Sequence, residues 1–230
     1  MSTLGDNTVV ILAGASGLVG TEVLKQVLED DTISRVYALT RKELPFFHSK
    51  LEQIQDNELN IVEWNNENPT PEIGVICLGT TLKQAGSKEK LEHVDYQLVC
   101  DVASSMKTLG VKKIAVVSSI GASSYSLSHY LKCKGRMEET ISGMEFEKVV
   151  FARPGPLTGL REETRNNEVV IEYIFKVLAP FMVGPLAKYI PIKADKVAKA
   201  MLCELFDHSG ESPKTLNSSE MKRLISRYSA

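Results

Sequence analysis

The chain of 230 residues lacks the features that define several large classes of protein. Its formal net charge is only −2, so there is no electrostatic reason to expect nucleic acid or an acidic membrane surface as its main partner. The apolar stretch at residues 169–192 is interrupted by charged residues and prolines, and it cannot supply the run of about 20 apolar residues that a transmembrane helix requires. We therefore expect no nucleic-acid partner and no transmembrane segment.

Cysteine and histidine are also scarce. The four cysteines lie far apart with no CxxC pair, and the four histidines lack the spacing of metal ligands. We therefore expect free thiols in a reducing compartment and no metal site. The eight residues before the first apolar run leave no room for a secretory signal or a transit peptide. Together these observations predict a cytoplasmic protein.

The most informative stretch is Val9–Gly20 (VVILAGASGLVG), in which an apolar run leads into three glycines spaced three residues apart. Glycine adopts backbone conformations that cost other residues energy, and it lets backbone N–H groups approach a phosphate at the positive end of the following helix. A strand, a glycine turn and a helix in this order indicate a dinucleotide diphosphate site. The residues expected to contact the cofactor here are Gly14, Ala15, Ser16, Gly17, Leu18, Val19 and Gly20.

Apolar runs and helical periodicity alternate along the rest of the chain. They predict strands at 35–39, 60–64, 73–78, 113–118 and 148–153, helices at 18–28, 88–109, 129–142 and 195–206, and mostly loop at 43–57. This alternation predicts a single α/β domain over residues 1–230, a Rossmann-type doubly wound fold whose mainly parallel sheet is flanked by helices. Residues 209–230 are expected to form a final strand and helix or to be partly disordered.

The end of the second expected strand helps to identify the cofactor. An NAD site usually has an acidic residue here that binds the ribose 2′-hydroxyl, but this chain has Arg41 and Lys42, with no carboxylate before Glu43. A guanidinium favours a 2′-phosphate. We therefore expect NADP(H) in preference to NAD(H), the alternative being that Arg41 is merely a solvated charge at a strand end.

Candidate catalytic residues follow the fifth expected strand. Tyr130 and Lys134 are four residues apart on an expected helix and so share a face, and an ammonium group close to a phenol stabilises the phenolate. That arrangement suits a proton donor to a carbonyl oxygen. Ser118 and Ser119 end the strand, and their hydroxyls are candidates to bind a substrate oxygen. The alternative is that both serines are turn residues and Tyr130 is a packed aromatic side chain.

Seven segments together resemble the short-chain dehydrogenase/reductase family. They are GASGLVG at 14–20, CLGTT at 77–81, AGS at 85–87, VD at 94–95, VVSS at 116–119, YLKCK at 130–134 and FARPGPLTGLREETR at 151–165. The chain looks most like an atypical branch that includes the Tat-interacting tumour-suppressor proteins, fungal mitochondrial relatives and many bacterial members. Two positions depart from the wider family, Ala13 before the first glycine and Trp64-Asn65 where an aspartate is common.

The resemblance implies roles for particular residues. Tyr130 would be the acid/base and Lys134 would hold the nicotinamide ribose, while Ser118 or Ser119, of which we favour Ser119, would orient the substrate. The further cofactor contacts that it implies are Leu78, Gly79, Thr80, Thr81, Ser118, Arg153 and Pro154. Residues 155–195, with a helix near 169–178, would cover the substrate pocket, and a helix-packed homodimer is expected by analogy.

The sequence thus predicts an NADP(H)-dependent oxidoreductase that transfers hydride to or from an unidentified small carbonyl or alcohol. One alternative is a regulatory protein that senses NADPH without turnover. Another is a nucleotide-sugar epimerase or dehydratase, for which the chain offers little beyond the cofactor domain.

Overall fold

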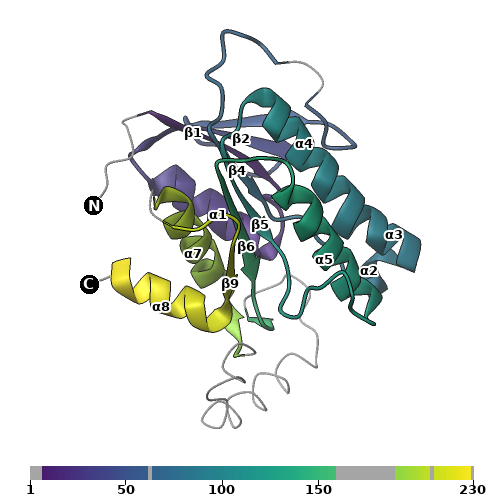
Figure 1. Cartoon of the computed structure of the whole chain (residues 1–230). Helices are drawn as coiled ribbons and strands as arrows, with labels where there is room; N and C mark the ends of the chain where they lie inside the picture. Colours follow the sequence, from purple (N-terminus) through teal and green to yellow (C-terminus); the bar gives the residue numbers. More distant parts are fainter. Residues whose placement is uncertain (1–6, 62–63, 159–189, 208–209, 229–230) are drawn as a thin grey trace.

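A computed structural model describes residues 7–61, 64–158, 190–207 and 210–228. A seven-stranded parallel sheet in the order β3-β2-β1-β4-β5-β6-β9 forms its centre, with helices on both faces (Figure 1). The strands are β1 (Thr8–Ala13), β2 (Ile33–Thr40), β3 (Leu51–Gln55), β4 (Ile73–Ile76), β5 (Lys113–Val117), β6 (Lys148–Arg153) and β9 (Lys214–Asn217). The predicted Rossmann-type fold is confirmed. The strand order reverses between β1 and β4, which is where sheets of this kind bind ligands.

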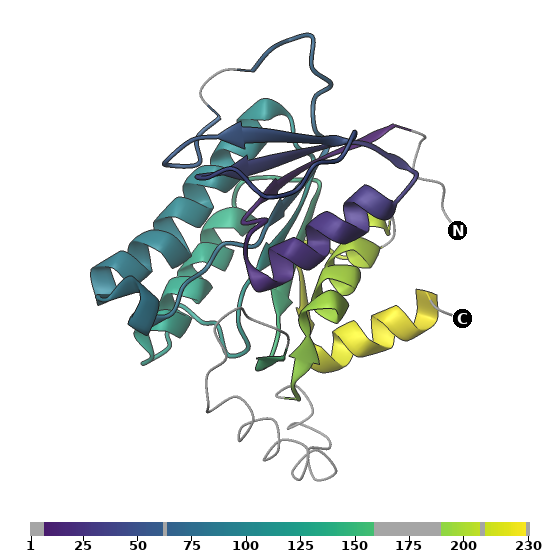
Figure 2. The same ribbon diagram turned by 180° about the vertical axis from the view of Figure 1, so that it is seen from behind.

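The helices form one layer on each face of the sheet, as the two opposite views show (Figures 1 and 2). One layer contains α1 (Leu18–Glu29), α7 (Ala194–Phe206) and α8 (Ser218–Tyr228). The other contains α2 (Leu82–Ala85), α3 (Lys88–Glu92), a π-helical segment η1 (His93–Leu98), α4 (Val99–Leu109) and α5 (His129–Ser142). A separate short ladder pairs β7 (Leu157–Thr158) with β8 (Ile192–Lys193).

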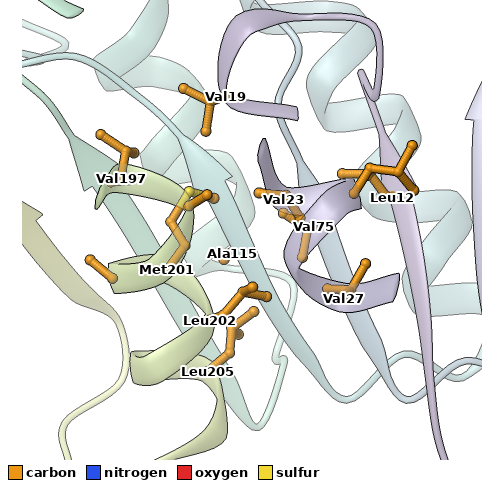
Figure 3. Close-up of a cluster of buried hydrophobic side chains, with 14 of the residues drawn as sticks. Leu12, Val19, Val23, Val27, Val75, Ala115, Val197, Met201, Leu202 and Leu205 are labelled. Atoms are coloured by element: carbon orange, nitrogen blue, oxygen red, sulfur yellow. The ribbon is translucent and has the colours of Figure 1, made fainter. Parts of the chain in front are cut away.

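Two hydrophobic clusters hold these layers together, because successive side chains of a strand point to opposite faces. In β1, Val10 and Leu12 belong to the cluster under α1 and α7, whereas Val9 and Ile11 belong to the cluster under α4 and α5. Figure 3 shows the first cluster, where valines of α1 and Met201 and its neighbours on α7 meet the strands. Burial on both faces explains why these strands read as uninterrupted apolar runs.

The third strand was predicted at the wrong place. It lies at Leu51–Gln55, inside the stretch predicted as loop, and residues 60, 61 and 64 are outside any strand. β3 is an edge strand with partly buried, mostly polar side chains, so it lacks the apolar signature of the inner strands. Ile61 and Trp64 are apolar because they pack against the second hydrophobic cluster.

The predicted helix at 88–109 is present, but η1 interrupts it between α3 and α4. Gly110 ends α4 in the left-handed conformation with φ of +110°, as its position predicts. The tail forms β9 and α8, so the first of the two expectations for it is correct. The helix expected at 169–178 and most of the expected substrate cover lie outside the described residues. Within the described part of the chain, no helix has the length and apolar character needed to cross a membrane.

Candidate functional site

The registers of the parallel strands bring the predicted site residues to one edge of the sheet. Ala13 is paired with both Leu39 and Ile76, and Val117 is paired with Ala152. The residues that follow these pairs are the glycine turn, the Arg41 segment, the CLGTT segment, the two serines and Arg153. The carboxyl edge of the sheet therefore collects segments that are far apart in the sequence.

The glycine turn forms a close-packed cradle at the start of α1. Gly14 has φ of +88°, and the Gly17 N–H donates to its carbonyl oxygen over 3.0 Å. A Cβ on Gly20 would lie 2.0 Å from that same oxygen, so no side chain fits there. Gly17 caps α1 without a side-chain hydrogen bond, and the first turn of the helix carries no acidic residue. The positive end of the helix dipole therefore suits an anionic ligand.

Cys77 joins the glycine turn to the CLGTT segment. Its N–H donates to the Ala13 carbonyl over 2.8 Å, and a Cβ on Gly14 would lie 2.7 Å from its carbonyl carbon. Burial raises the pKa of the Cys77 thiol to about 12, against the opposing effect of the Lys134 ammonium. The thiol is therefore neutral at physiological pH and serves as packing beneath the turn.

The segment after β2 presents two free cations. Arg41 and Lys42 are exposed, and neither forms an ion pair with any described residue. The Thr40 hydroxyl donates to the Lys42 carbonyl over 2.6 Å, which fixes the backbone of the turn. Because Leu39 is paired with Ala13, both residues follow β2 at the sheet edge that carries the glycine turn.

Lys134 is the most deeply buried cation of the site. Its side chain is 1% exposed, and its Nζ lies 2.8 Å from Oδ1 of Asp95, whose side chain is equally buried. The ammonium also donates to the carbonyl oxygens of Val117 over 3.3 Å and Leu78 over 3.5 Å. It therefore sits between the carboxyl ends of β4 and β5, with protein acceptors on three sides.

Asp95 had no role in the sequence-based prediction, although it belongs to the VD pair that contributed to the resemblance. It lies in η1, and its Oδ2 accepts the Thr80 N–H over 3.0 Å. The carboxylate thus contacts both the lysine and the CLGTT segment. The informative signal in the sequence was an acidic residue on the inward face of a helix that is otherwise apolar there.

Tyr130 and the two serines differ in how their hydroxyls are used. Tyr130 lies in the first turn of α5 and is half-buried, and its hydroxyl makes no hydrogen bond within the described ranges. Ser118 is buried, with no partner for its Oγ among the described residues. Ser119 is half-buried, and its hydroxyl makes a long bond of 3.4 Å to the Ile120 carbonyl. The greater accessibility of Ser119 favours it over Ser118 as a substrate contact.

Arg153 is already engaged by a carboxylate. Its Nε donates to Oε1 of Glu138 over 2.8 Å, and its Nη2 donates to Oε2 of the same residue. These bonds raise the pKa of Arg153 above its usual value. Glu138 lies four residues after Lys134 on α5 and so shares its helix face. This spacing was visible in the sequence, but Glu138 was not predicted to be a site residue. Arg153 thereby connects β6 to the helix that carries Tyr130.

Three side chains with metal-binding groups also come together beside this site. Potential ligand atoms of Glu92, His129 and Cys133 lie within 4.8 Å of one another, a grouping that the sequence spacing did not predict. However, Glu92 is paired with Arg136 over 2.6 Å, and burial raises the pKa of the Cys133 thiol. The carboxylate is therefore already paired with a cation, and the thiol resists the deprotonation that a metal ligand requires.

A solved structure confirms the type of fold. The UDP-glucose 4-epimerase of Thermotoga maritima, solved with UDP-glucose, matches with a TM-score of 0.67 at 14% sequence identity, covering 95% of this chain and 82% of that chain. The two chains thus share the Rossmann-type fold. The resemblance to the Tat-interacting proteins in particular is not confirmed by these comparisons.

Relatives found by sequence have a higher sequence identity to this chain than the solved structure has. The protein "FMP52, mitochondrial" of Eremothecium gossypii is 30% identical over 219 residues, covering 94% of this chain and 96% of the relative. The protein of the same name in Saccharomyces cerevisiae is 32% identical over 169 residues, covering 68% of this chain and 69% of the relative. Their names contradict the predicted cytoplasmic location, which rested on the scattered cysteines and on the few residues before the first apolar run. A family model described as HIM1 matches residues 44–179, and the chain belongs to the HIM1 family.

Proposed function

We propose that the protein is an oxidoreductase that binds NADP(H) and transfers hydride to or from a small carbonyl or alcohol substrate. The observation that carries this proposal is the Lys134 ammonium, buried at the carboxyl ends of β4 and β5 and one helical turn after a half-buried tyrosine without a hydrogen-bond partner in the described chain. This placement supports catalysis at the sheet edge that also carries the glycine cradle.

The residues at this edge fit a dinucleotide. Side chains on Gly14 and Gly20 would clash with backbone atoms of the turn, so these glycines keep the turn tight. The start of α1 has no side-chain cap, which leaves its backbone N–H groups for a diphosphate. Leu78, Gly79, Thr80 and Thr81 would line the same ligand, because Gly14 packs directly against Cys77. Arg41 and Lys42 would bind a ribose 2′-phosphate, which favours NADP(H) over NAD(H).

The catalytic residues would handle the proton and orient the substrate. The nicotinamide supplies or accepts the hydride. Tyr130 donates its hydroxyl proton to the substrate oxygen during reduction, and takes it back during oxidation. Lys134 stabilises the phenolate that Tyr130 then becomes. The Ser119 hydroxyl donates a hydrogen bond to the same substrate oxygen and so fixes its position.

The names of the curated relatives favour a mitochondrial location for this protein. A carbonyl reductase there would use the mitochondrial NADPH pool. Fluorescence microscopy of the full chain carrying a C-terminal fluorescent protein would test this, and a diffuse signal outside mitochondria would contradict it.

Cofactor binding and turnover can be tested together. Purified protein is titrated calorimetrically with NADPH and NADH, and NADPH oxidation is then followed with a panel of aldehydes, ketones and quinones. Tyr130→Phe should bind NADPH like wild type and lower kcat about 10²- to 10⁴-fold, the usual contribution of general acid catalysis. Tyr125→Phe is the matched control, because Tyr125 is 92% exposed in the preceding loop.

Each alternative function has its own outcome in this experiment. NADPH binding without turnover of any panel member, with wild-type cellular behaviour of Tyr130→Phe, would support the NADPH-sensing regulator. Interconversion of UDP-sugars without net consumption of cofactor would support an epimerase, the activity named for the Thermotoga maritima protein. Failure to bind either dinucleotide would overturn the proposed function.

A further inference from the structure

We propose that Asp95 is a positioning residue that fixes the Lys134 ammonium in place and links it to the cofactor-binding segment after β4. The inference rests on the proposed function for the role of Lys134. Asp95 contacts the lysine and the protein backbone. It therefore acts through Lys134 and not on the substrate.

The contacts of Lys134 are the first argument. An ammonium group has three N–H donors, and three protein oxygens surround Nζ: Oδ1 of Asp95 at 2.8 Å, the Val117 carbonyl at 3.3 Å and the Leu78 carbonyl at 3.5 Å. The carboxylate is the nearest of these and the one that carries a charge. Its position therefore determines where the ammonium sits between the two strand ends.

Burial is the second argument. Both side chains are 1% exposed, and a buried charge is strongly penalised unless an opposite charge accompanies it. Other titratable groups near the ammonium are the thiols of Cys77, Cys100 and Cys133, and burial raises the pKa of each, which keeps them neutral near pH 7. Asp95 is therefore the counter-ion of Lys134 within the described residues.

The second oxygen of Asp95 provides the link to the cofactor segment. Oδ2 accepts the Thr80 N–H over 3.0 Å, which fixes the backbone between Gly79 and Thr81. Gly79 is close to both charges, because a Cβ there would lie 3.1 Å from Oδ1 of Asp95 and 3.5 Å from Nζ of Lys134. One carboxylate thus positions the catalytic lysine and the loop expected to line the cofactor.

The local helix geometry provides an independent indication. Asp95 lies in the π-helical segment between α3 and α4, and π-helical turns occur frequently at functional sites. From this turn, Oδ1 reaches the Lys134 ammonium at 2.8 Å and Oδ2 accepts the Thr80 N–H.

The test uses the full-length protein and NADPH as the probe. Asp95→Asn keeps the size of the side chain and an acceptor for the Thr80 N–H, but it removes the charge. We expect the Kd for NADPH, measured by calorimetry, to rise about tenfold or more, which corresponds to losing one charge-assisted hydrogen bond. In a Lys134→Met background, the same substitution should leave the Kd unchanged. Asp101→Asn, an exposed carboxylate on α4, is the matched control.

The pH dependence of stability separates this role from simple packing. In folded Asp95→Asn the lysine lacks its counter-ion, so the folded state binds fewer protons than the unfolded chain. The variant therefore becomes more stable relative to wild type as pH rises from 6 to 9. Loss of packing alone would give a constant difference. Adding Lys134→Met removes the buried charge, and it should restore the melting temperature and abolish this pH dependence.

Three outcomes are decisive. Equal NADPH affinity of wild type and Asp95→Asn overturns the inference and leaves the proposed function intact. Absence of dinucleotide binding by wild type overturns the proposed function, and the inference falls with it even if the stability measurements reveal an ion pair. If Asp95→Asn does not fold, Gly79→Ala replaces it, since its Cβ would lie 3.1 Å from Oδ1 of Asp95 and would crowd the carboxylate; an unchanged Kd for NADPH in that variant would also overturn the inference.

Discussion

Arg153 at the end of β6 and Glu138 on α5 form a two-pronged ion pair, with Nε and Nη2 of the arginine donating to the two carboxylate oxygens. The Glu138 side chain is 8% exposed and that of Arg153 is 28% exposed. The pair connects the strand to the helix of Tyr130 and Lys134. Its geometry assigns Arg153 a structural contact in addition to the cofactor contact that the resemblance implies.

Glu138→Gln is expected to lower the free energy of unfolding by about 1–2 kcal/mol, because Arg153 loses a charged partner while solvent still screens part of its charge. Urea denaturation measures this change. Glu147→Gln, which alters an exposed carboxylate, should have no effect of this size. A Glu138→Gln variant as stable as wild type would show that the ion pair contributes nothing measurable.

Gly20→Ala is expected to disrupt the glycine turn, since its Cβ would lie 2.0 Å from the Gly14 carbonyl oxygen. Forcing a methyl group into such packing costs about 1–3 kcal/mol of stability. We expect a lower melting temperature and loss of detectable NADPH binding by calorimetry. Gly143→Ala is the control, because the nearest atom to its Cβ would be 3.5 Å away. Normal NADPH binding by Gly20→Ala would contradict the assignment of this turn.

The inner sheet could be predicted from the sequence because its strands are buried on both faces and therefore apolar throughout, as in Ile73–Ile76. The edge strand Leu51–Gln55 could not, because solvent exposure lets polar residues occupy most of its positions. Local periodicity identifies an element by the surface that it buries, and β3 buries little.

The parts of the candidate site that consist of short sequence patterns could be predicted, whereas contacts between distant segments could not. The glycine turn and the Tyr130–Lys134 spacing are short sequence patterns, and the structure brings both to the same sheet edge. The Lys134–Asp95 contact joins two helical segments that are far apart in the sequence, and Asp95 lies in the π-helical one. The sequence places an acidic residue on an otherwise apolar helix face, but it does not identify the residue that this carboxylate pairs with.

Arg41→Ala tests the cofactor preference. Removing a cation that binds a 2′-phosphate should weaken NADPH binding about 10- to 100-fold, the range expected for charge-assisted hydrogen bonds, and should change NADH binding little. Calorimetric Kd values for the two cofactors provide the comparison. Lys25→Ala is the control, since Lys25 is an exposed cation on α1 that pairs with Glu22. An equal loss of affinity for both cofactors would refute the preference for NADP(H).

The Cys100 thiol on α4 predicts a particular loss of stability at alkaline pH. Burial raises its pKa to about 11 in the folded protein, whereas an unfolded cysteine titrates near about 8.5. Between these values the unfolded chain releases a proton that the folded protein retains, so this contribution to stability is present below about pH 8.5 and is lost as pH rises towards 11.

The slope from one thiol is at most about 1.4 kcal/mol per pH unit. Urea denaturation of wild type and Cys100→Ala at intervals from pH 7.5 to 10.5 isolates this effect, because the lysines and tyrosines titrate alike in both proteins. We expect the stability advantage of wild type to shrink steadily across the range. Parallel stability curves would mean that Cys100 ionises equally in the folded and unfolded states, contrary to its burial between α4 and α5.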